Sequence, residues 1–128
     1  MSPDNRLRMF GRERQLLSEN ALSYAGLQTR RFYNLDHQVY QDGALPSRTK
    51  ELMGLVTSLV LRCDDCIMYH LSQCHEIGIS DDELEETLTI GLIVGGSITI
   101  PHIRRIWDVW REVKNNREGA PKNRNDHG

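Results

Sequence analysis

Two cysteines and a histidine follow one another closely near the middle of the chain. Cys63 and Cys66 are separated by two residues, and His70 comes four residues after the second cysteine. If this segment is helical, the three side chains share one face, because residues three and four apart are neighbours on a helix. Two thiols at this spacing can form a dithiol/disulfide couple, and an imidazole one turn from Cys66 can accept the proton of that thiol. The segment therefore predicts thiol redox chemistry.

Other interpretations of the cysteines are open. Free cysteines are often buried as small apolar side chains. His70 and Cys74 extend the pair into a string that resembles a zinc-binding motif. On a helix, however, Cys63 and Cys74 would lie ~16 Å apart, too far to share one tetrahedral ion. We therefore expect no metal and no cofactor, and we expect Cys74 either to serve in packing or to be a bystander.

A carboxylate upstream could complete the group. If the chain reverses between about Leu61 and Asp64, Glu51 and His70 come level on two antiparallel helices. A carboxylate at that place would orient the imidazole and raise its basicity. One uninterrupted helix over 47–77 would instead separate their Cα atoms by ~28 Å. The proposed pair thus depends on a helix break at this point.

The elements that must position these side chains are all expected to be helices. Apolar residues recur at three- to four-residue spacing in successive segments, and the fold class is predicted to be all-α. Gly43 suits a left-handed residue after the first of these helices, and Gly78 ends the helix of the cysteines. Ser80 and Glu83 form a capping box at the start of the next helix. The expected helices cover about 28–42, 47–61, 64–77, 81–95 and 101–113.

The two ends of the chain differ from this central part. Residues 1–27 are polar and charged, and we expect an N-terminal extension with a short helix. Residues 114–128 show no periodicity and are rich in Asn, Arg, Lys and Gly, which predicts a disordered tail. Residues 28–113 would then form the single domain of this 128-residue chain.

Composition narrows the class of protein. The formal net charge of -2 and the pI of about 6.2 offer no basic surface for nucleic acid. Neither a secretory signal nor an apolar run of the ~20 residues that span a membrane is seen. Three cysteines, two of them clustered, do not suggest a secreted disulfide framework. We expect a cytoplasmic protein that binds neither nucleic acid nor membrane.

Glu51, Cys63, Cys66 and His70 together resemble the E…C-x-x-C-x-x-x-H pattern of alkylhydroperoxidase D-like (AhpD-like) proteins, a branch of the carboxymuconolactone decarboxylase-like family. The resemblance covers about 28–113. It implies an AhpD-like all-helical bundle in which an antiparallel helix pair carries the C-x-x-C motif. It also implies a homo-oligomer, a trimer or hexamer, that associates through its helices. The flanking segments that agree are 43–46, 48–52, 80–84 and 92–96.

The same resemblance implies roles for the four residues. Cys66 would be the peroxidatic thiol, activated through His70 and Glu51, and Cys63 would be the resolving thiol that closes the disulfide. Asp65 stands where the alkylhydroperoxidase has a second histidine, so the proton relay would be shorter.

Other neighbours of the motif bear on its reactivity. Arg62 stands where the family usually has glycine, at the expected turn. Asp64 and Asp65 place negative charge near the cysteines and would oppose a thiolate there. His102 follows the 92–96 segment and either lines the site or lies in an exposed loop.

The sequence thus predicts an oligomeric thiol oxidoreductase that reduces a hydroperoxide or a partner's disulfide, with electrons from a thiol or dithiol donor. Two rivals remain. Lactone decarboxylation, the reaction of the family's namesake, has no use for a dithiol. A non-catalytic oligomeric binding or redox-sensing protein would be favoured by unreactive cysteines.

Overall fold

The computed structural model describes residues 5–118, which fold into six α-helices and one short 3₁₀ helix, η1 (Ser97–Thr99). The all-α prediction is confirmed. Within this part of the chain, no helix has both the length and the apolar character that a membrane span requires. The helices are α1 (Arg6–Ser23), α2 (Leu27–Val39), α3 (Ser47–Leu61), α4 (Asp64–Glu76), α5 (Asp81–Gly95) and α6 (Ile100–Glu118).

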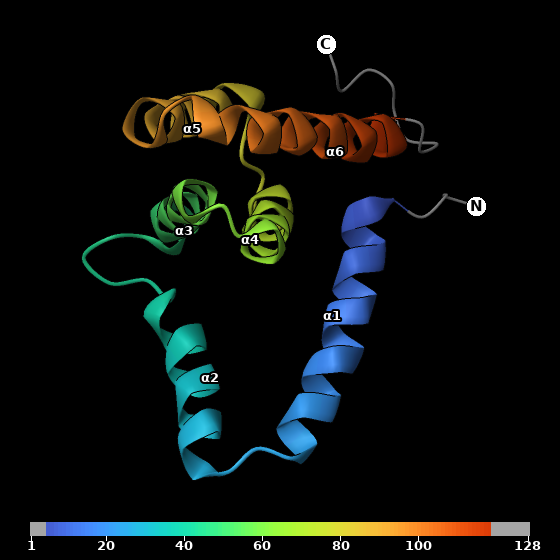
Figure 1. Ribbon diagram of the computed structural model, residues 1–128, viewed down its shortest axis with the longest axis vertical. Coiled ribbons are helices and arrows are strands. Elements are labelled where there is room, and N and C mark those ends of the chain that lie inside the picture. The colour runs from blue at the N-terminus through green and yellow to red at the C-terminus, as the bar shows by residue number, and fades with distance from the viewer. Residues whose placement is uncertain (1–4, 119–128) are drawn as a thin grey trace.

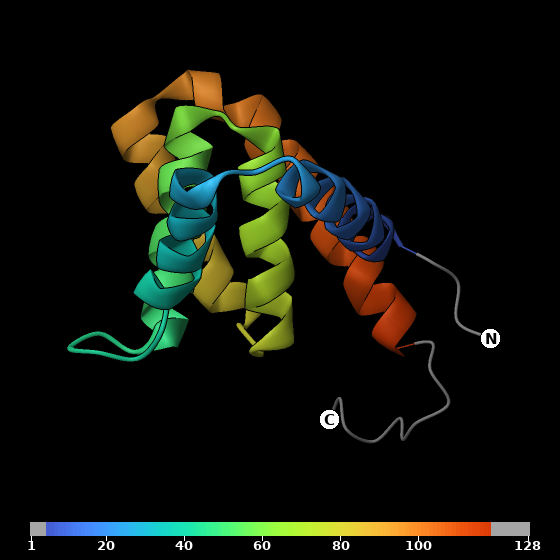
Figure 2. The ribbon, with the colours of Figure 1, turned by 90° about the horizontal axis from the view of Figure 1, so that it is seen from below.

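The helices α3 to α6 form the packed body of the molecule, and α1 and α2 form a V whose open side faces this body and whose point is the loop between the two helices (Figure 1). α3 and α4 lie side by side and run in opposite directions (Figure 2). The apolar stripes predicted for these two helices supply the centre of the core. Its fully or nearly fully buried members include Leu55, Leu59, Ile67, Leu71, Leu84, Leu88, Ile106, Val109 and Trp110.

The reversal between α3 and α4 takes only two residues, as predicted. Arg62 adopts a left-handed conformation, with φ 59° and ψ 39°, and its N–H donates to the carbonyl of Leu59. Cys63 is extended and serves as the N-cap of α4. An arginine costs free energy in the left-handed region that a glycine would not, because its Cβ crowds the backbone. The turn nevertheless forms here with arginine.

The entry into α5 follows the predicted local signals. Gly78 has φ +80° after the end of α4, and Ser80 and Glu83 form the capping box at the start of α5. Further along α5, a Cβ added at Gly91 would lie 2.6 Å from Cδ2 of Leu59. The absence of that Cβ lets α3 and α5 approach closely.

The N-terminal helix is much longer than expected. α1 has 18 residues rather than one short helix, and the side chain of Asn5 caps it by accepting the N–H of Arg8. Arg6 then ties its first turn to Asp108 and Glu112 of α6, at 2.8 and 3.2 Å. These partners lie more than a hundred residues away in sequence, so no local pattern could indicate them.

Two helix ends also differ from the prediction. α2 stops at Val39, three residues before the expected end, and Gly43 does not adopt a left-handed conformation. The ammonium of Lys50 binds the carbonyls of Val39 and Gln41, at 2.9 and 2.7 Å, and so holds the chain just after the helix. α6 continues to Glu118, beyond the expected start of the tail at 114. Residues 119–128, the remainder of the tail, lie outside the described residues.

Candidate redox site

The two cysteines lie at the N-terminus of α4. Cys63 and Cys66 are joined by a disulfide, and their Cα atoms are 5.3 Å apart. The backbone N–H of Cys66 donates to Sγ of Cys63, 3.3 Å away, so this sulfur caps the helix. A helix N-terminus favours negative charge, and after reduction it would stabilise a thiolate at Cys63. Cys66 is exposed, whereas Cys63 is half-buried.

Glu51 and His70 meet between α3 and α4, at the level that the predicted reversal requires. Oε1 of Glu51 lies 2.9 Å from Nδ1 of His70. The two residues are only 6% and 8% exposed. Because an ionised carboxylate can only accept a hydrogen bond, Nδ1 carries the proton of this bond. In the neutral imidazole, the lone pair is then on Nε2, which is the arrangement that a general base needs.

The Nε2 side of His70 faces a tyrosine that the sequence analysis did not single out. The hydroxyl of Tyr40, just after α2, lies 3.4 Å from Nε2. The rings of Tyr40 and Tyr69 also pack against the imidazole, with centroids 5.3 and 5.2 Å from it. Among the described residues, hydrogen bonds join His70 to Glu51 and Tyr40 and none joins it to Cys66. The expected bond from Cys66 to His70 is therefore not present in this disulfide form.

Gly54 makes room for this arrangement and was also missed. A Cβ at this position would lie 2.7 Å from Cε1 of His70 and 2.9 Å from the hydroxyl of Tyr40. The imidazole thus packs directly on the backbone of α3. The available signal was a glycine in the middle of a strongly predicted helix that does not break there.

The charge of Asp64 is balanced by residues of α6. Its Oδ1 lies 2.9 Å from Nδ1 of His102 and 3.6 Å from the guanidinium of Arg105. His102 therefore lies in the first turn of α6 and holds the start of α4, rather than lying in an exposed loop. The expected repulsion between Asp64 and a nearby thiolate is weakened by these two partners.

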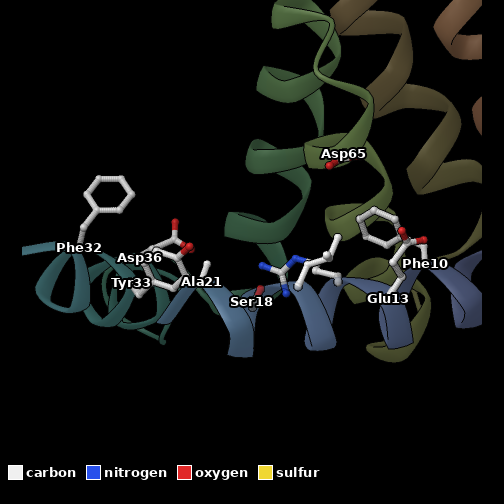
Figure 3. A pocket seen from close by; sticks show the side chains of 10 residues that line it. Phe10, Glu13, Ser18, Ala21, Phe32, Tyr33, Asp36 and Asp65 are labelled. Atoms are coloured by element: carbon white, nitrogen blue, oxygen red, sulfur yellow. The ribbon is translucent and has the colours of Figure 1, made fainter. Parts of the chain in front are cut away.

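Asp65 is one of the residues that line a groove between α1 and α2 (Figure 3). The groove has a volume of about 600 Å³. It mixes apolar and charged side chains, and its rim at Asp65 is adjacent in sequence to the exposed Cys66. The other lining residues include Phe10, Glu13, Arg14, Phe32, Tyr33 and Asp36.

The third cysteine is set apart from this chemistry. Cys74 is fully buried in the core. Burial, assisted by the negative charge of Glu51, raises the pKa of its thiol to about 12. Its role in packing is as predicted. In the part of the chain that the structure describes, histidines, cysteines and carboxylates nowhere gather in a group of three that could hold a metal ion.

Known proteins resemble this chain both in sequence and in fold. Two crystal structures of a Thermotoga maritima protein superpose with TM-scores of 0.85 and 0.83 at 50% and 49% identity. They cover 88% and 89% of this chain and 99% and 97% of theirs. That protein is described as a carboxymuconolactone decarboxylase family member with a suggested part in the antioxidative response.

A Legionella pneumophila protein of the same family, in its apo form, shares the fold alone. It has a TM-score of 0.76 at 20% identity, over 85% of this chain and 97% of its own.

Among curated proteins, an uncharacterised protein of Cupriavidus necator is 38% identical over 56 residues. This match covers 44% of the chain and 50% of that protein, so the chain spans about half the length of this relative. An uncharacterised protein from the cox locus of Paracoccus denitrificans is 26% identical over 82 residues, 64% of the chain and 74% of that protein.

The model of the carboxymuconolactone decarboxylase family matches residues 29–108, which include α3, α4, α5 and all four predicted site residues. More than half of the chain is covered by this match. The chain therefore belongs to the carboxymuconolactone decarboxylase family.

Proposed function

We propose that this chain is a thiol oxidoreductase that reduces a hydroperoxide, or the disulfide of a partner, with the dithiol of Cys63 and Cys66. The observation that carries the proposal is the buried hydrogen bond between Glu51 and His70, one helical turn from the redox-active pair. A carboxylate and an imidazole so arranged supply a base for thiol activation. The suggested antioxidative part of the Thermotoga maritima protein is in keeping with this chemistry.

The proposed cycle begins with the reduced protein. Nε2 of His70 accepts the proton of the Cys66 thiol, and the thiolate attacks the terminal oxygen of the hydroperoxide. The O–O bond breaks, the proton returns to the departing alkoxide, and Cys66 becomes a sulfenic acid. The Cys63 thiolate then attacks the Cys66 sulfur and closes the disulfide, and the departing hydroxide takes up the proton that the Cys63 thiol has given up and leaves as water.

An external reductant must reopen this disulfide. A thiol or dithiol donor would attack one of the two sulfurs, form a mixed disulfide and leave in its oxidised form. The reducing cytoplasm is the compartment where such donors are abundant, and we place the reaction there.

One equivalent of hydrogen peroxide should remove two of the three thiols of the reduced protein. Cys66 and Cys63 are converted to the disulfide, whereas Cys74 is buried and its pKa is raised to about 12. Thiols are counted after denaturation, before and after the peroxide. The reaction should outpace that of free dithiothreitol at the same concentration.

A protein with both Cys63 and Cys66 replaced by serine is the control and should keep its single thiol. Three thiols remaining in the native sequence after treatment would contradict the proposed function.

We also propose that copies of the chain associate through α1 and α2. None of the residues of α2, all of which the structure describes, is buried. An isolated helix of this length is marginal in water, so its apolar face needs a cover. A second copy filling the groove of Figure 3 would provide it. The exposed apolar side chains on the two helices are Met9, Leu16, Leu17, Leu27, Phe32, Leu35 and Val39.

Sedimentation at micromolar concentration should give three or six times the chain mass of 14.8 kDa. Phe32→Glu, which places a charge on the apolar face of α2, should shift the protein toward smaller species, because a charge buried at an interface is costly. Asn34→Glu adds the same charge on the opposite face and is the control. A native chain that sediments as a monomer would overturn this prediction.

A further inference from the structure

Nε2 of His70 contacts Tyr40 in this structure, whereas the proposed cycle requires it to accept a proton from Cys66. Nε2 is the atom that must accept the proton of Cys66, but in this disulfide form it faces the hydroxyl of Tyr40, 3.4 Å away. A disulfide sulfur has no proton to donate. The tyrosine is therefore the donor that faces Nε2 in the disulfide form, and the thiol becomes available as a second donor only on reduction.

Tyr40 is held in this place by contacts on both sides of it. Lys50 of α3 binds the carbonyls of Val39 and Gln41, the residues before and after the tyrosine. Gly54 lacks the Cβ that would collide with the hydroxyl. α3, the same helix that carries Glu51, thus helps to set the position of Tyr40 just after α2.

Tyr40 is also in the right protonation state to donate. Burial raises the pKa of its phenol, and the negative charges of Asp36 and Glu51 raise it further. The hydroxyl therefore keeps its proton, and Nε2 is the acceptor. A pocket of about 370 Å³ opens beside the pair, lined by Tyr40, His70 and Gly54 among others. When the Cys66 thiol donates to Nε2 instead, the Tyr40 hydroxyl can turn toward water in this pocket.

We propose that Tyr40 is a positioning residue that occupies Nε2 of His70 in the disulfide form and yields it to the Cys66 thiol on reduction. The inference rests on the proposed function insofar as His70 serves Cys66. The hydroxyl keeps the imidazole oriented while no thiol is present. It also stabilises the disulfide form relative to the dithiol, because its hydrogen bond to His70 is made in that form alone.

The first test is the redox equilibrium of the full chain with dithiothreitol or glutathione, which needs no peroxide and stays valid if the peroxidase proposal fails. Tyr40→Phe keeps the ring and removes the hydroxyl. It should shift the equilibrium toward the dithiol by about two- to fivefold, as loss of one long neutral hydrogen bond predicts. Tyr24→Phe is the control, because Tyr24 is 87% exposed at the end of α1.

The second test measures an NMR signal of the imidazole itself, and it remains informative if Tyr40→Phe alters the packing. The ¹⁵N resonance of Nε2 of His70 is recorded in both redox states. Tyr40→Phe should move it in the disulfide form and leave it in place in the dithiol form, where Cys66 is the donor. An unchanged equilibrium together with an unchanged resonance in the disulfide form would overturn the proposal. Equal changes of the resonance in both redox states would overturn it too.

Discussion

Replacing Cys66 with serine is expected to abolish peroxide turnover. Cys66 is the exposed cysteine of the pair and lies one helical turn before His70, the proposed base. Cys63 lies seven residues before the histidine, roughly two turns or ~10 Å along the helix axis. Peroxide consumption is measured with dithiothreitol as the electron donor. Residual turnover by Cys66→Ser would show that the attacking thiol is a different one.

Cys63→Ser should instead react once and stop. A serine at the N-cap keeps the cap of α4, so the start of the helix is preserved. Cys66 is still oxidised to the sulfenic acid, but no second thiol closes the disulfide. A reagent specific for sulfenic acids should label Cys66 in this variant, as mass spectrometry can show. Continuous peroxide turnover by Cys63→Ser would contradict the resolving role of that residue.

The different roles proposed for the two thiols also agree with their places at the start of α4. Sγ of Cys63 accepts the N–H of Cys66, and the nearby Asp64 is paired with His102 and Arg105. After reduction, a thiolate at the half-buried Cys63 would therefore be stabilised, which suits its proposed attack on the neighbouring sulfur. Cys66 lacks this cap but is open to substrate. The two thiols differ in access and in stabilisation, which is what the two proposed roles require.

The reversal that brings Glu51 to His70 could be predicted because its signals are local. An apolar stripe ends at Leu61, and Cys63 is followed by the aspartates that begin the next helix. A turn depends on a few consecutive residues, and counting along two antiparallel helices then gives the level of each side chain. Arg62 alone argued against a turn at this place, because a left-handed conformation costs an arginine free energy. It adopts that conformation all the same, so the packing of α3 on α4 outweighs this cost.

Tyr40 and Gly54 could not be found in this way. The sequence places Tyr40 within a helix over 28–42, next to its apolar positions. The helix instead ends at Val39, one residue before the tyrosine, and Lys50 binds the carbonyls on either side of the tyrosine. That contact joins residues about ten apart across a turn, and the hydroxyl then meets a histidine thirty residues away. Such long-range contacts leave no periodic trace in the sequence.

Gly54→Ala is expected to slow the reaction of Cys66 with peroxide by about 10²-fold, the loss that a misplaced catalytic group of this kind brings. In an open helix this substitution stabilises, because alanine is the better helix former. Here the added methyl group would lie 2.7 Å from Cε1 of His70. The imidazole must move, and it carries Nε2 away from the place where Cys66 can reach it. Stopped-flow measurement of the first oxidation gives the rate.

Gly11→Ala is the matched control, since a Cβ at Gly11 of α1 meets nothing within 4 Å. It should leave the rate unchanged and make unfolding by urea slightly harder. His70→Ala removes the base itself and should slow the first oxidation by ~10²–10⁴-fold. Glu51→Gln keeps a hydrogen-bonding partner for the imidazole without the charge, and it should slow the reaction less than His70→Ala does. If Gly54→Ala folds and reacts at the native rate while His70→Ala does not, the base tolerates displacement. The packing of His70 on α3 would then have no part in activating Cys66.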